Sequence, residues 1–432
     1  IELVKEIKAG AGGSYPDDLV TIGDYIYFSA EDDTHGRELW RTDGTAAGTE
    51  LIKDIFDGFS ASEPLGFVDQ GDWILFSADD GVHGRELWRT DGTDVGTTLV
   101  EDIAAAANSS SPSQLVSNGL GYVYFTATDF INGTEIWRTD GSAAGTMLWD
   151  NISEFGDSNP QDLTLFNGVI YFSADDDTHS RELWRADGAS ASMVKEINET
   201  GTSYPMDFTA FDGYLYFRAT DSTHGNELWR TDGTEIGTTL VKDINPTGDA
   251  NPGDRFVEHA GRLYFQANDG TNGSELWRTD GSAGGTQLVG NVNAGSADSY
   301  PNPAVSLGDY LYFSAYDEPH DAYYVYRTDG SAIERVPFPR DPAQFIDCDC
   351  GDSYLFAVGS TLFATVYSVE AGHEIGHEFA YLTEPTTDLP STDRNGTLAR
   401  DAFALLALAT AVAGLTLRRA GRRSAKQGIN LQ

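Results

Sequence analysis

The stretch Glu38-Leu-Trp-Arg-Thr-Asp-Gly-Thr45 decides the fold of this chain, because close copies of it return at a nearly fixed interval. The steps between successive copies are 48, 49, 47, 45, 48 and 49 residues. A constant period of this size is typical of a repeat architecture in which each copy marks one structural unit. The later copies begin at Glu86, Glu135, Glu182, Glu227 and Glu275, and a degenerate copy begins at Tyr324.

Each repeat contains four runs of residues that favour β-strands. In the first repeat these runs are Asp18–Ile22, Tyr25–Ala30, Glu38–Thr42 and Thr49–Ile55. Aromatic and branched side chains dominate them, as they do in strands. Asp43-Gly44 between the third and fourth runs is a strong signal for a tight turn. Each repeat is therefore expected to form a four-stranded antiparallel sheet.

The second and third runs are apolar at consecutive positions, such as Ile26-Tyr27-Phe28 and Leu39-Trp40. A sheet with one face in water would alternate apolar and polar residues instead. Both faces of each sheet must therefore be covered by neighbouring sheets. Radially arranged four-stranded sheets meet this demand, so we predict an all-β fold of the β-propeller class.

The number of blades follows from the two ends of the repeat region. Seven copies of the motif give seven units, and residues 341–384 have the pattern of a further unit with three strands. Ile1–Ile7 repeats the pattern of Leu51–Ile55, which is the fourth strand of a unit. Pairing of this N-terminal strand with the last three strands would remove an open sheet edge. We therefore predict an eight-bladed propeller over residues 1–384, with seven blades as the alternative.

The composition changes after residue 384. Residues 385–400 form a polar linker, residues 401–418 are nearly free of charge, and residues 419–432 are rich in arginine. The apolar segment is expected to be a transmembrane helix, and the positive-inside rule places the basic tail in the cytoplasm. A helix that docks on a partner is the alternative. The propeller is then an ectodomain on a cell surface or a virion membrane.

The net charge of the chain is −41, and it has six Lys against twenty-one Arg. Such an acidic surface repels nucleic acid, which we exclude as a partner of the propeller. The abundance of Asp and the scarcity of Lys point to a halophilic source, because molar salt shortens the Debye length to about 3 Å and screens the repulsion. An extracellular propeller also agrees with six Asn-x-Ser/Thr glycosylation sequons. They begin at Asn108, Asn132, Asn151, Asn198, Asn272 and Asn395.

An Asp and a His precede the motif Glu in most repeats, as Asp32 and His35 precede Glu38. These residue types could hold a cation, but Asn replaces His in two repeats, which favours a hydrogen-bonding role. His373-Glu374-Ile-Gly-His377 matches a zinc-protease motif, but that chemistry needs a helix, and the flanking glycines disfavour one. Asp32, His35, His373 and His377 are therefore only weak metal candidates. No cofactor and no catalytic residue is expected.

The repeated Glu, Trp, Arg, Asp and Gly are interpreted as structural residues. In the first two repeats they are Glu38, Trp40, Arg41, Asp43, Gly44, Glu86, Trp88, Arg89, Asp91 and Gly92. The motif resembles the ELWxxDGT repeat of large bacterial and archaeal surface or secreted proteins. The acidity and the C-terminal anchor resemble haloarchaeal cell-surface proteins.

This resemblance implies a membrane-anchored adhesion or assembly module that binds a protein or glycan partner and is not an enzyme. Two alternatives stay open. One is a structural or host-attachment protein of a halophilic virus. The other is a propeller hydrolase that acts at the central channel.

Overall fold

The computed structural model describes residues 3–9, 13–188, 190–253, 255–336, 355–358, 361–370 and 373–383. The chain divides into two compact units, with the boundary between Glu196 and Ile197. The predicted linker, transmembrane helix and basic tail lie outside the described residues, as does Asn395. Within the part of the chain that is described, no helix is long and apolar enough to cross a membrane.

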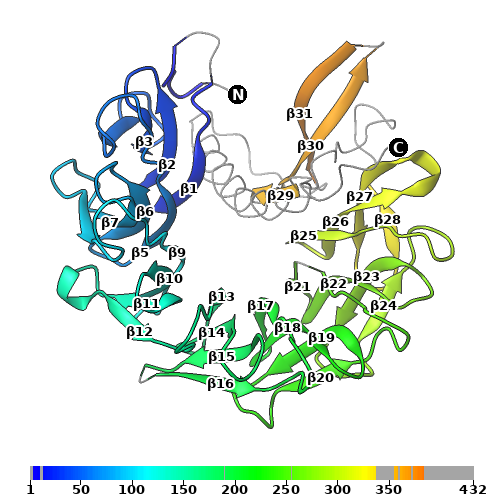
Figure 1. Ribbon diagram of the computed structural model, residues 1–432. Helices are drawn as coiled ribbons and strands as arrows, with labels where there is room; N and C mark the ends of the chain where they lie inside the picture. The colour runs from blue at the N-terminus through cyan, green and yellow to red at the C-terminus, as the bar shows by residue number, and fades with distance from the viewer. Residues whose placement is uncertain are drawn as a thin grey trace, which may run out of the picture. The chain divides into compact units, whose positions relative to one another are not determined.

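The first unit contains four antiparallel sheets, each with four strands in sequential order. We call them blades 1 to 4, and Figure 1 labels their strands. Blade 1 comprises β1 (Asp17–Ile22), β2 (Tyr25–Asp32), β3 (Gly36–Thr42) and β4 (Glu50–Lys53). Blade 2 comprises β5 (Leu65–Asp69), β6 (Ile74–Asp79), β7 (Arg85–Thr90) and β8 (Thr98–Glu101). Blade 3 comprises β9 (Ser113–Ser117), β10 (Val123–Asp129), β11 (Gly133–Thr139) and β12 (Met147–Asp150), with a 3₁₀ turn at Ala143–Gly145. Blade 4 comprises β13 (Gln161–Phe166), β14 (Val169–Ala174), β15 (Glu182–Ala186) and β16 (Ala191–Lys195).

The second unit contains three further four-stranded sheets, blades 5 to 7, and one three-stranded sheet. Blade 5 comprises β17 (Met206–Phe211), β18 (Tyr214–Asp221), β19 (Gly225–Thr231) and β20 (Thr239–Lys242). Blade 6 comprises β21 (Val257–His259), β22 (Arg262–Asn268), β23 (Ser274–Thr279) and β24 (Gln287–Gly290). Blade 7 comprises β25 (Asn302–Leu307), β26 (Tyr310–Asp317), β27 (Ala322–Thr328) and β28 (Ile333–Arg335), with a 3₁₀ turn at Glu318–His320. The last sheet comprises β29 (Leu355–Val358), β30 (Thr361–Glu370) and β31 (His373–Thr383).

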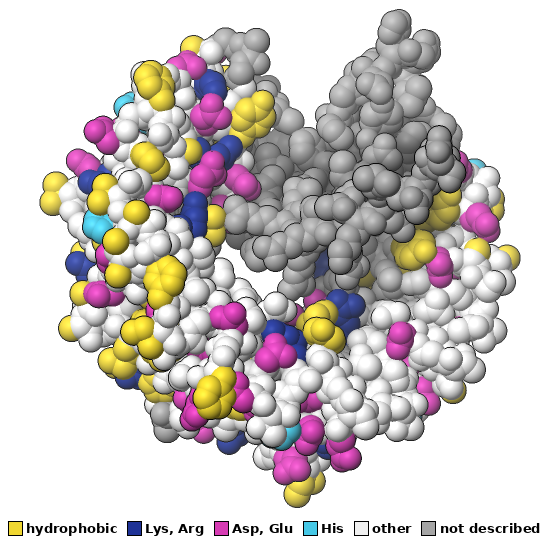
Figure 2. Space-filling view, in the orientation of Figure 1, with side chains coloured by type: hydrophobic (Ala, Val, Ile, Leu, Met, Phe, Trp, Pro, Cys, Tyr) yellow, Lys and Arg dark blue, Asp and Glu magenta, His cyan; other side chains and the backbone are white. Residues whose placement is uncertain are grey.

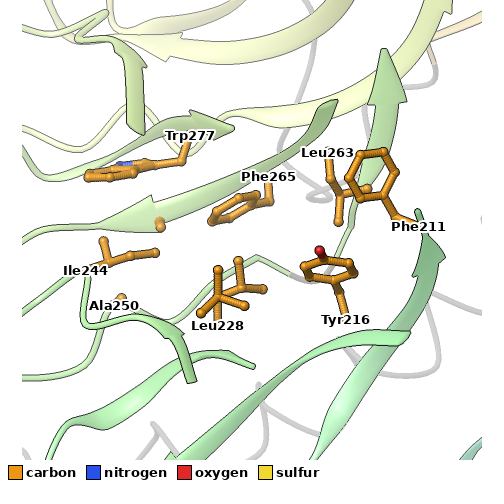
Figure 3. Packing of buried hydrophobic residues seen from close by; sticks show 10 residues of the cluster. Phe211, Tyr216, Leu228, Ile244, Ala250, Leu263, Phe265 and Trp277 are labelled. Carbon is orange, nitrogen blue, oxygen red and sulfur yellow. The ribbon is translucent and has the colours of Figure 1, made fainter. Parts of the chain in front are cut away.

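The core lies between successive sheets of a unit, as the consecutive apolar positions predict. Ile26, Tyr27 and Phe28 on β2 are all buried, so both faces of the strand are covered. Figure 3 shows this packing between blades 5 and 6, where Leu228 and Tyr216 meet Leu263 and Phe265. Seven up-and-down four-stranded sheets with apolar side chains on both faces confirm the all-β fold and support the propeller class.

One detail of the prediction is wrong. Residues 3–9 form no strand, and the sheet β29–β31 contains three strands among the described residues, so the expected closing strand is not formed. The N-terminal segment docks on blade 1 through side chains instead. Lys5 Nζ donates to the Thr49 carbonyl at 2.6 Å, Lys8 pairs with Glu31, and Ile7 packs on the cluster that contains Trp40.

Candidate functional site

The Glu of the repeated motif fastens each blade to the segment that leads into the next. Glu38 is 0% exposed. Its carboxylate accepts hydrogen bonds from the Ile55 amide at 2.8 Å, the Ser62 amide at 2.9 Å and the Ser62 hydroxyl at 2.6 Å. Buried carboxylates are costly unless they are hydrogen-bonded in this way. The motif Glu is therefore a structural clamp and is not available to a ligand.

The same clamp recurs within each unit. Glu86 accepts from Ser110, Glu135 from Ser158 and Glu275 from Ser299. This serine was not among the predicted residues, although the sequence carries a signal for it. A Ser-x-Pro triplet precedes the first strand of six blades and begins at Ser14, Ser62, Ser110, Ser158, Ser203 and Ser299.

Burial shifts the acidity of these carboxyls upward. Burial raises the pKa of Glu38, Glu227 and Glu275 to about 7, although hydrogen bonds from neighbouring backbone amides oppose the shift. The pKa of Glu86 and Glu135 is raised for the same reason. The cost of removing the charged carboxylate from water therefore exceeds the stabilisation that its hydrogen bonds provide.

The remaining motif residues hold turns and neighbouring blades together. Trp40 and Trp88 are buried. Asp43 and Asp91 each accept from the amide two residues later, and Gly44 and Gly92 follow them with φ of 86° and 87°, values that favour glycine. The motif arginine reaches further, because Arg89 Nη1 donates to the Gly141 carbonyl of the next blade at 2.7 Å. Arg41 stacks on Tyr25 and pairs with Glu50.

The repeated Asp and His form a closed loop. Asp32 Oδ1 accepts from the His35 amide at 2.7 Å, and Asp32 Oδ2 contacts His35 Nδ1 at 2.8 Å. In blade 3 the Asn132 side chain makes the same contact to Asp129 at 2.7 Å. Glu38 points to the clamp instead of toward this pair. Among the described residues, no group of three or more His, Cys, Asp or Glu side chains is arranged to hold a metal ion.

The two histidines of the protease-like motif lie on a strand. His373 and His377 belong to β31, in which Glu374 is opposite Val369 of β30. The motif requires two His residues on one face of a helix, and β31 does not provide that arrangement.

The described sequons occupy different settings. Asn132 and Asn272 hold the Asp–His-type loops of their blades, and Asn108 is exposed before blade 3. Asn151 is partly buried after β12, and Asn198 caps a turn through the Thr200 amide.

Two neighbouring loops of blade 3 expose large apolar side chains. Phe130 and Ile131, between β10 and β11, are 73% and 91% exposed, and Phe155, in the segment after β12, is 89% exposed. Ile131 and Phe155 line one pocket of about 210 Å³ together with Asn132, Gly133, Glu154, Gly156 and Asp157. We call these two loops the blade 3 loop pair. Acidic side chains are spread over much of the face in Figure 2. Other large apolar side chains are also exposed, among them Phe59 at 82% and Ile236 at 92%, but the blade 3 loop pair gathers three of them at neighbouring loops, two beside one pocket.

Hydrogen bonds hold the blade 3 loop pair in place. Asp157 Oδ1 accepts from the Thr134 amide at 2.7 Å, which ties the second loop to the start of β11. Asp177 of blade 4 accepts from the Ser153 hydroxyl at 2.8 Å and the Glu154 amide at 2.7 Å. The apolar side chains are thus presented by a fixed backbone, which lowers the entropic cost of binding a partner.

Comparison of the repeats would have found this site. The position of Ile131 is Thr in four other blades, at Thr34, Thr178, Thr223 and Thr271. Our sequence analysis aligned these loops for their Asp and His and did not compare the two residues between them.

The first strands carry a second set of polar groups. A bulge in each of β1, β13 and β17 places Asp18, Asp162 and Asp207 at positive φ. Asp18 accepts from the Gly66 amide of the next blade at 2.7 Å. Asp207 pairs with Arg218 at 2.7 Å, and their side chains are 3% and 15% exposed. The bulge position of these three first strands is therefore acidic, and the partner of the carboxylate differs between blades 1 and 5.

No family model and no curated protein matches this sequence. The chain is similar to solved structures of a puromycin hydrolase mutant (16% identity, TM-score 0.40) and of prolyl endopeptidases (12% identity, TM-score 0.42). Each match covers 82% of this chain, and this chain spans 59% and 55% of the length of those proteins. It is also similar to the β-propeller domain of the Trilobed protease from Pyrococcus furiosus (12% identity, TM-score 0.37), with coverage of 77% of this chain and 100% of that domain.

These similarities correct one expectation. The sequence-based hypothesis that the chain is not an enzyme is contradicted, because the three structures named above come from hydrolytic enzymes. We withdraw that hypothesis. Since all the identities are 16% or lower, the likeness concerns the fold and transfers no activity or substrate.

Proposed function

We propose that this chain is a β-propeller that recognises polypeptide through the blade 3 loop pair. The observation that supports this proposal is the exposure of three large apolar side chains, Phe130, Ile131 and Phe155, on two neighbouring loops that share a pocket. Aromatic and aliphatic anchors that enter a desolvated pocket supply most of the affinity at protein interfaces. Each such side chain contributes roughly 1.5–3 kcal/mol when it is fully buried by a partner.

The polar rim of the pocket suits a peptide backbone. Asn132, Glu154 and Asp157 line it beside the apolar groups. A few polar groups around an apolar pocket are what fixes the orientation of a bound chain. The expected ligand is therefore an extended segment with one or two large apolar side chains.

The test uses the full chain and variants that the other blades already contain. Ile131→Thr installs the residue of blades 1, 4, 5 and 6, so the loop should keep its fold. Val82→Thr makes the same kind of change at the matching position of blade 2 and serves as the control. Fluorescence anisotropy with labelled peptides that contain a single Phe measures the affinity.

Ile131→Thr is expected to weaken peptide binding by about tenfold, because it removes apolar contact area from the pocket rim. Val82→Thr should leave the affinity unchanged. Equal affinities for both variants would overturn the proposal. Loss of lipid-vesicle binding, and not of peptide binding, in Ile131→Thr would assign the loops to a membrane instead.

Peptide hydrolysis is the second candidate, and the Asp207–Arg218 pair favours it over adhesion. Asp207, on the first strand of blade 5, is buried and paired with the guanidinium of Arg218 on the second strand. A hydrolase that acts at the first strands requires polar groups of this kind. Nothing in the described residues supports an adhesive role. Assays with fluorogenic peptides should detect turnover that Asp207→Asn abolishes, and absence of turnover in the unchanged protein would remove this candidate.

The finer points of architecture and location also remain proposals. We propose that the sheet β29–β31 is the eighth blade and that residues 401–418 anchor the propeller to a membrane, with the basic tail inside. The repeat pattern and the apolar run support them. Membrane fractionation of the full chain and of a chain that ends at residue 384 tests the anchor, since only the full chain should sediment with membranes.

A further inference from the structure

Blade 7 differs from the other blades in the loop that joins its second and third strands. The paired ends of these strands are Asp32 and Gly36 in blade 1, but Asp317 and Ala322 in blade 7, so blade 7 has one additional residue. That residue is Asp321, which follows His320 and adopts a left-handed conformation with φ of 51°. The cross-strand pair beside the loop also changes, because it is Tyr316 and Tyr323 in blade 7.

Tyr316 and Tyr323 lie beside Tyr300, because the Tyr316 amide donates to the carbonyl of the preceding Ser299 at 2.7 Å. We call this surface group, Tyr300, Tyr316 and Tyr323, the tyrosine patch. The rings of Tyr316 and Tyr323 lie 5.4 Å apart at 60°. The Tyr316 hydroxyl donates to Asp321 at 2.6 Å, and the Tyr300 hydroxyl donates to Asp298 at 2.8 Å. Tyr323 also packs against the buried cluster around Val336. The patch is therefore rigid before any partner arrives.

The corresponding positions of three other blades carry an arginine and an acid. Arg37, Arg85 and Arg181 occupy the place of Tyr323, and Glu31, Asp79 and Asp175 occupy the place of Tyr316. In those blades the arginine donates to the carbonyl of the residue before the proline, as Arg181 does to Asn159 at 2.9 Å. Blade 7 has replaced this internal cation with aromatic rings.

Three carboxylates near the tyrosine patch, Asp298, Glu318 and Asp321, form no ion pair among the residues that the structure describes. Within the same described residues, no Lys or Arg stacks on Tyr300 or Tyr316. Elsewhere this chain places an arginine over a tyrosine of the second strand, as with Arg230 over Tyr214 at 4.2 Å and Arg327 over Tyr310 at 4.2 Å. The nearby Arg335 is engaged with Tyr324 and Asp317.

We infer that the tyrosine patch binds a cationic side chain, Lys or Arg, of a polypeptide partner. The faces of Tyr300 and Tyr316 attract a cation through their π-electrons, and Asp298, Glu318 and Asp321 add charge complementarity. Phosphorylated or otherwise anionic ligands are excluded, because three carboxylates would repel them. This site lies on a different blade from the blade 3 loop pair and does not depend on the proposed function of that pair.

The experiment measures binding of a short acetylated and amidated peptide with three arginines to the full chain by calorimetry. The matched probe is the same peptide with citrulline, which keeps the shape and removes the charge. Salt at about 1 M shortens the Debye length to about 3 Å and suppresses non-specific attraction to the acidic surface. The arginine peptide should bind in a saturable manner and the citrulline peptide about tenfold more weakly.

Two variants that keep the net charge and one that removes a single carboxylate locate the site. Tyr316→Thr installs the residue found at Thr128 and Thr220 in blades 3 and 5, and should weaken arginine-peptide binding about tenfold. Tyr15→Ser changes the blade 1 counterpart of Tyr300 and should have no effect. Asp321→Asn keeps both rings and should weaken binding less than Tyr316→Thr does.

Three results would overturn the inference. They are equal binding of the arginine and citrulline peptides, equal losses in Tyr316→Thr and Tyr15→Ser, and Tyr316-dependent binding of a neutral oligosaccharide in place of the peptide. Thermal unfolding of each variant checks that the blade stays folded. Ile131→Thr should bind the arginine peptide normally, which separates this inference from the function proposed for blade 3.

Discussion

The hydroxyl of Ser62 donates a hydrogen bond to Glu38 at 2.6 Å, although the two residues belong to different repeats. Glu38 ends no strand and faces no solvent, and its carboxylate gathers donors from the segment that enters blade 2. The most repeated acidic residue of the chain is thus a device for joining blades. Function must be sought where blades differ.

Glu38→Ala is expected to destabilise the protein by about 3 kcal/mol, because it removes the acceptor of the buried Ile55 amide and leaves the Ser62 amide with only the Arg37 carbonyl at 3.1 Å. Ser62→Ala should cost only about 1 kcal/mol, since it removes one hydrogen bond. Ala250, in the segment that enters blade 6, already occupies this position opposite Glu227. Urea unfolding measures both values, and Glu50→Ala, on the exposed side of β4, is the control. Equal effects of Glu38→Ala and Glu50→Ala would contradict the clamp.

The buried glutamates should make the protein less stable as the pH rises from 4.5 to about 7. Burial raises the pKa of Glu38, Glu227 and Glu275 from 4.5 to about 7. Because the folded state holds these protons more tightly than the unfolded state, their contribution is fully present below pH 4.5 and is lost through pH 7.

Unfolding midpoints measured across this pH range in high salt, which screens the general surface charge, test this dependence. Glu38→Gln should flatten the curve, since glutamine does not titrate. An unchanged slope in that variant would show that other groups cause the dependence.

His35 provides a second and separable pH dependence. The hydrogen bond to Asp32 raises the pKa of His35 above 6.5, and Asp54 contributes further. The stabilisation is therefore fully present below pH 6.5 and is lost as the pH rises through the higher folded value. His35→Asn copies blades 3 and 6, where Asn132 and Asn272 donate to the Asp residues equivalent to Asp32. The variant should fold normally and lose the pH dependence above 6.5. The magnitude is expected to be small, because the imidazole is more than a third exposed.

The sequence predicts the parts of this fold that repeat. Apolar residues at consecutive positions of β2 and β3 required sheets covered on both faces, and Asp43-Gly44 required a tight turn. Both features are local, so a single chain reveals them. The partner of Glu38 could not be assigned from its own repeat, because Ser62 lies 24 residues away in the next one.

The candidate site was harder to predict for a related reason. Phe130, Ile131 and Phe155 come together only because a loop and a following segment lie side by side, which spacing alone does not show. The sequence marked blade 7 as irregular through the degenerate motif copy that begins at Tyr324. The hydrogen bond from Tyr316 to Asp321, which makes those rings rigid, needed coordinates.

Ile7 occupies the place before blade 1 that Ile55 occupies before blade 2. It packs on Trp40 and Phe28 of blade 1, as Ile55 packs on Trp88 and Phe76 of blade 2. Lys5 likewise donates to Thr49, as Lys242 does to Thr286 within the second unit at 2.7 Å. The N-terminal segment therefore has the contacts of an outer strand and linker, although it forms no strand.

Ile7→Ala should destabilise the protein by about 2 kcal/mol, at the low end for such truncations, because Ile7 is only partly buried. Leu3→Ala, at a position 80% exposed, should have no measurable effect on the unfolding midpoint. If both variants unfold like the unchanged protein, the N-terminal segment contributes nothing to the stability of blade 1.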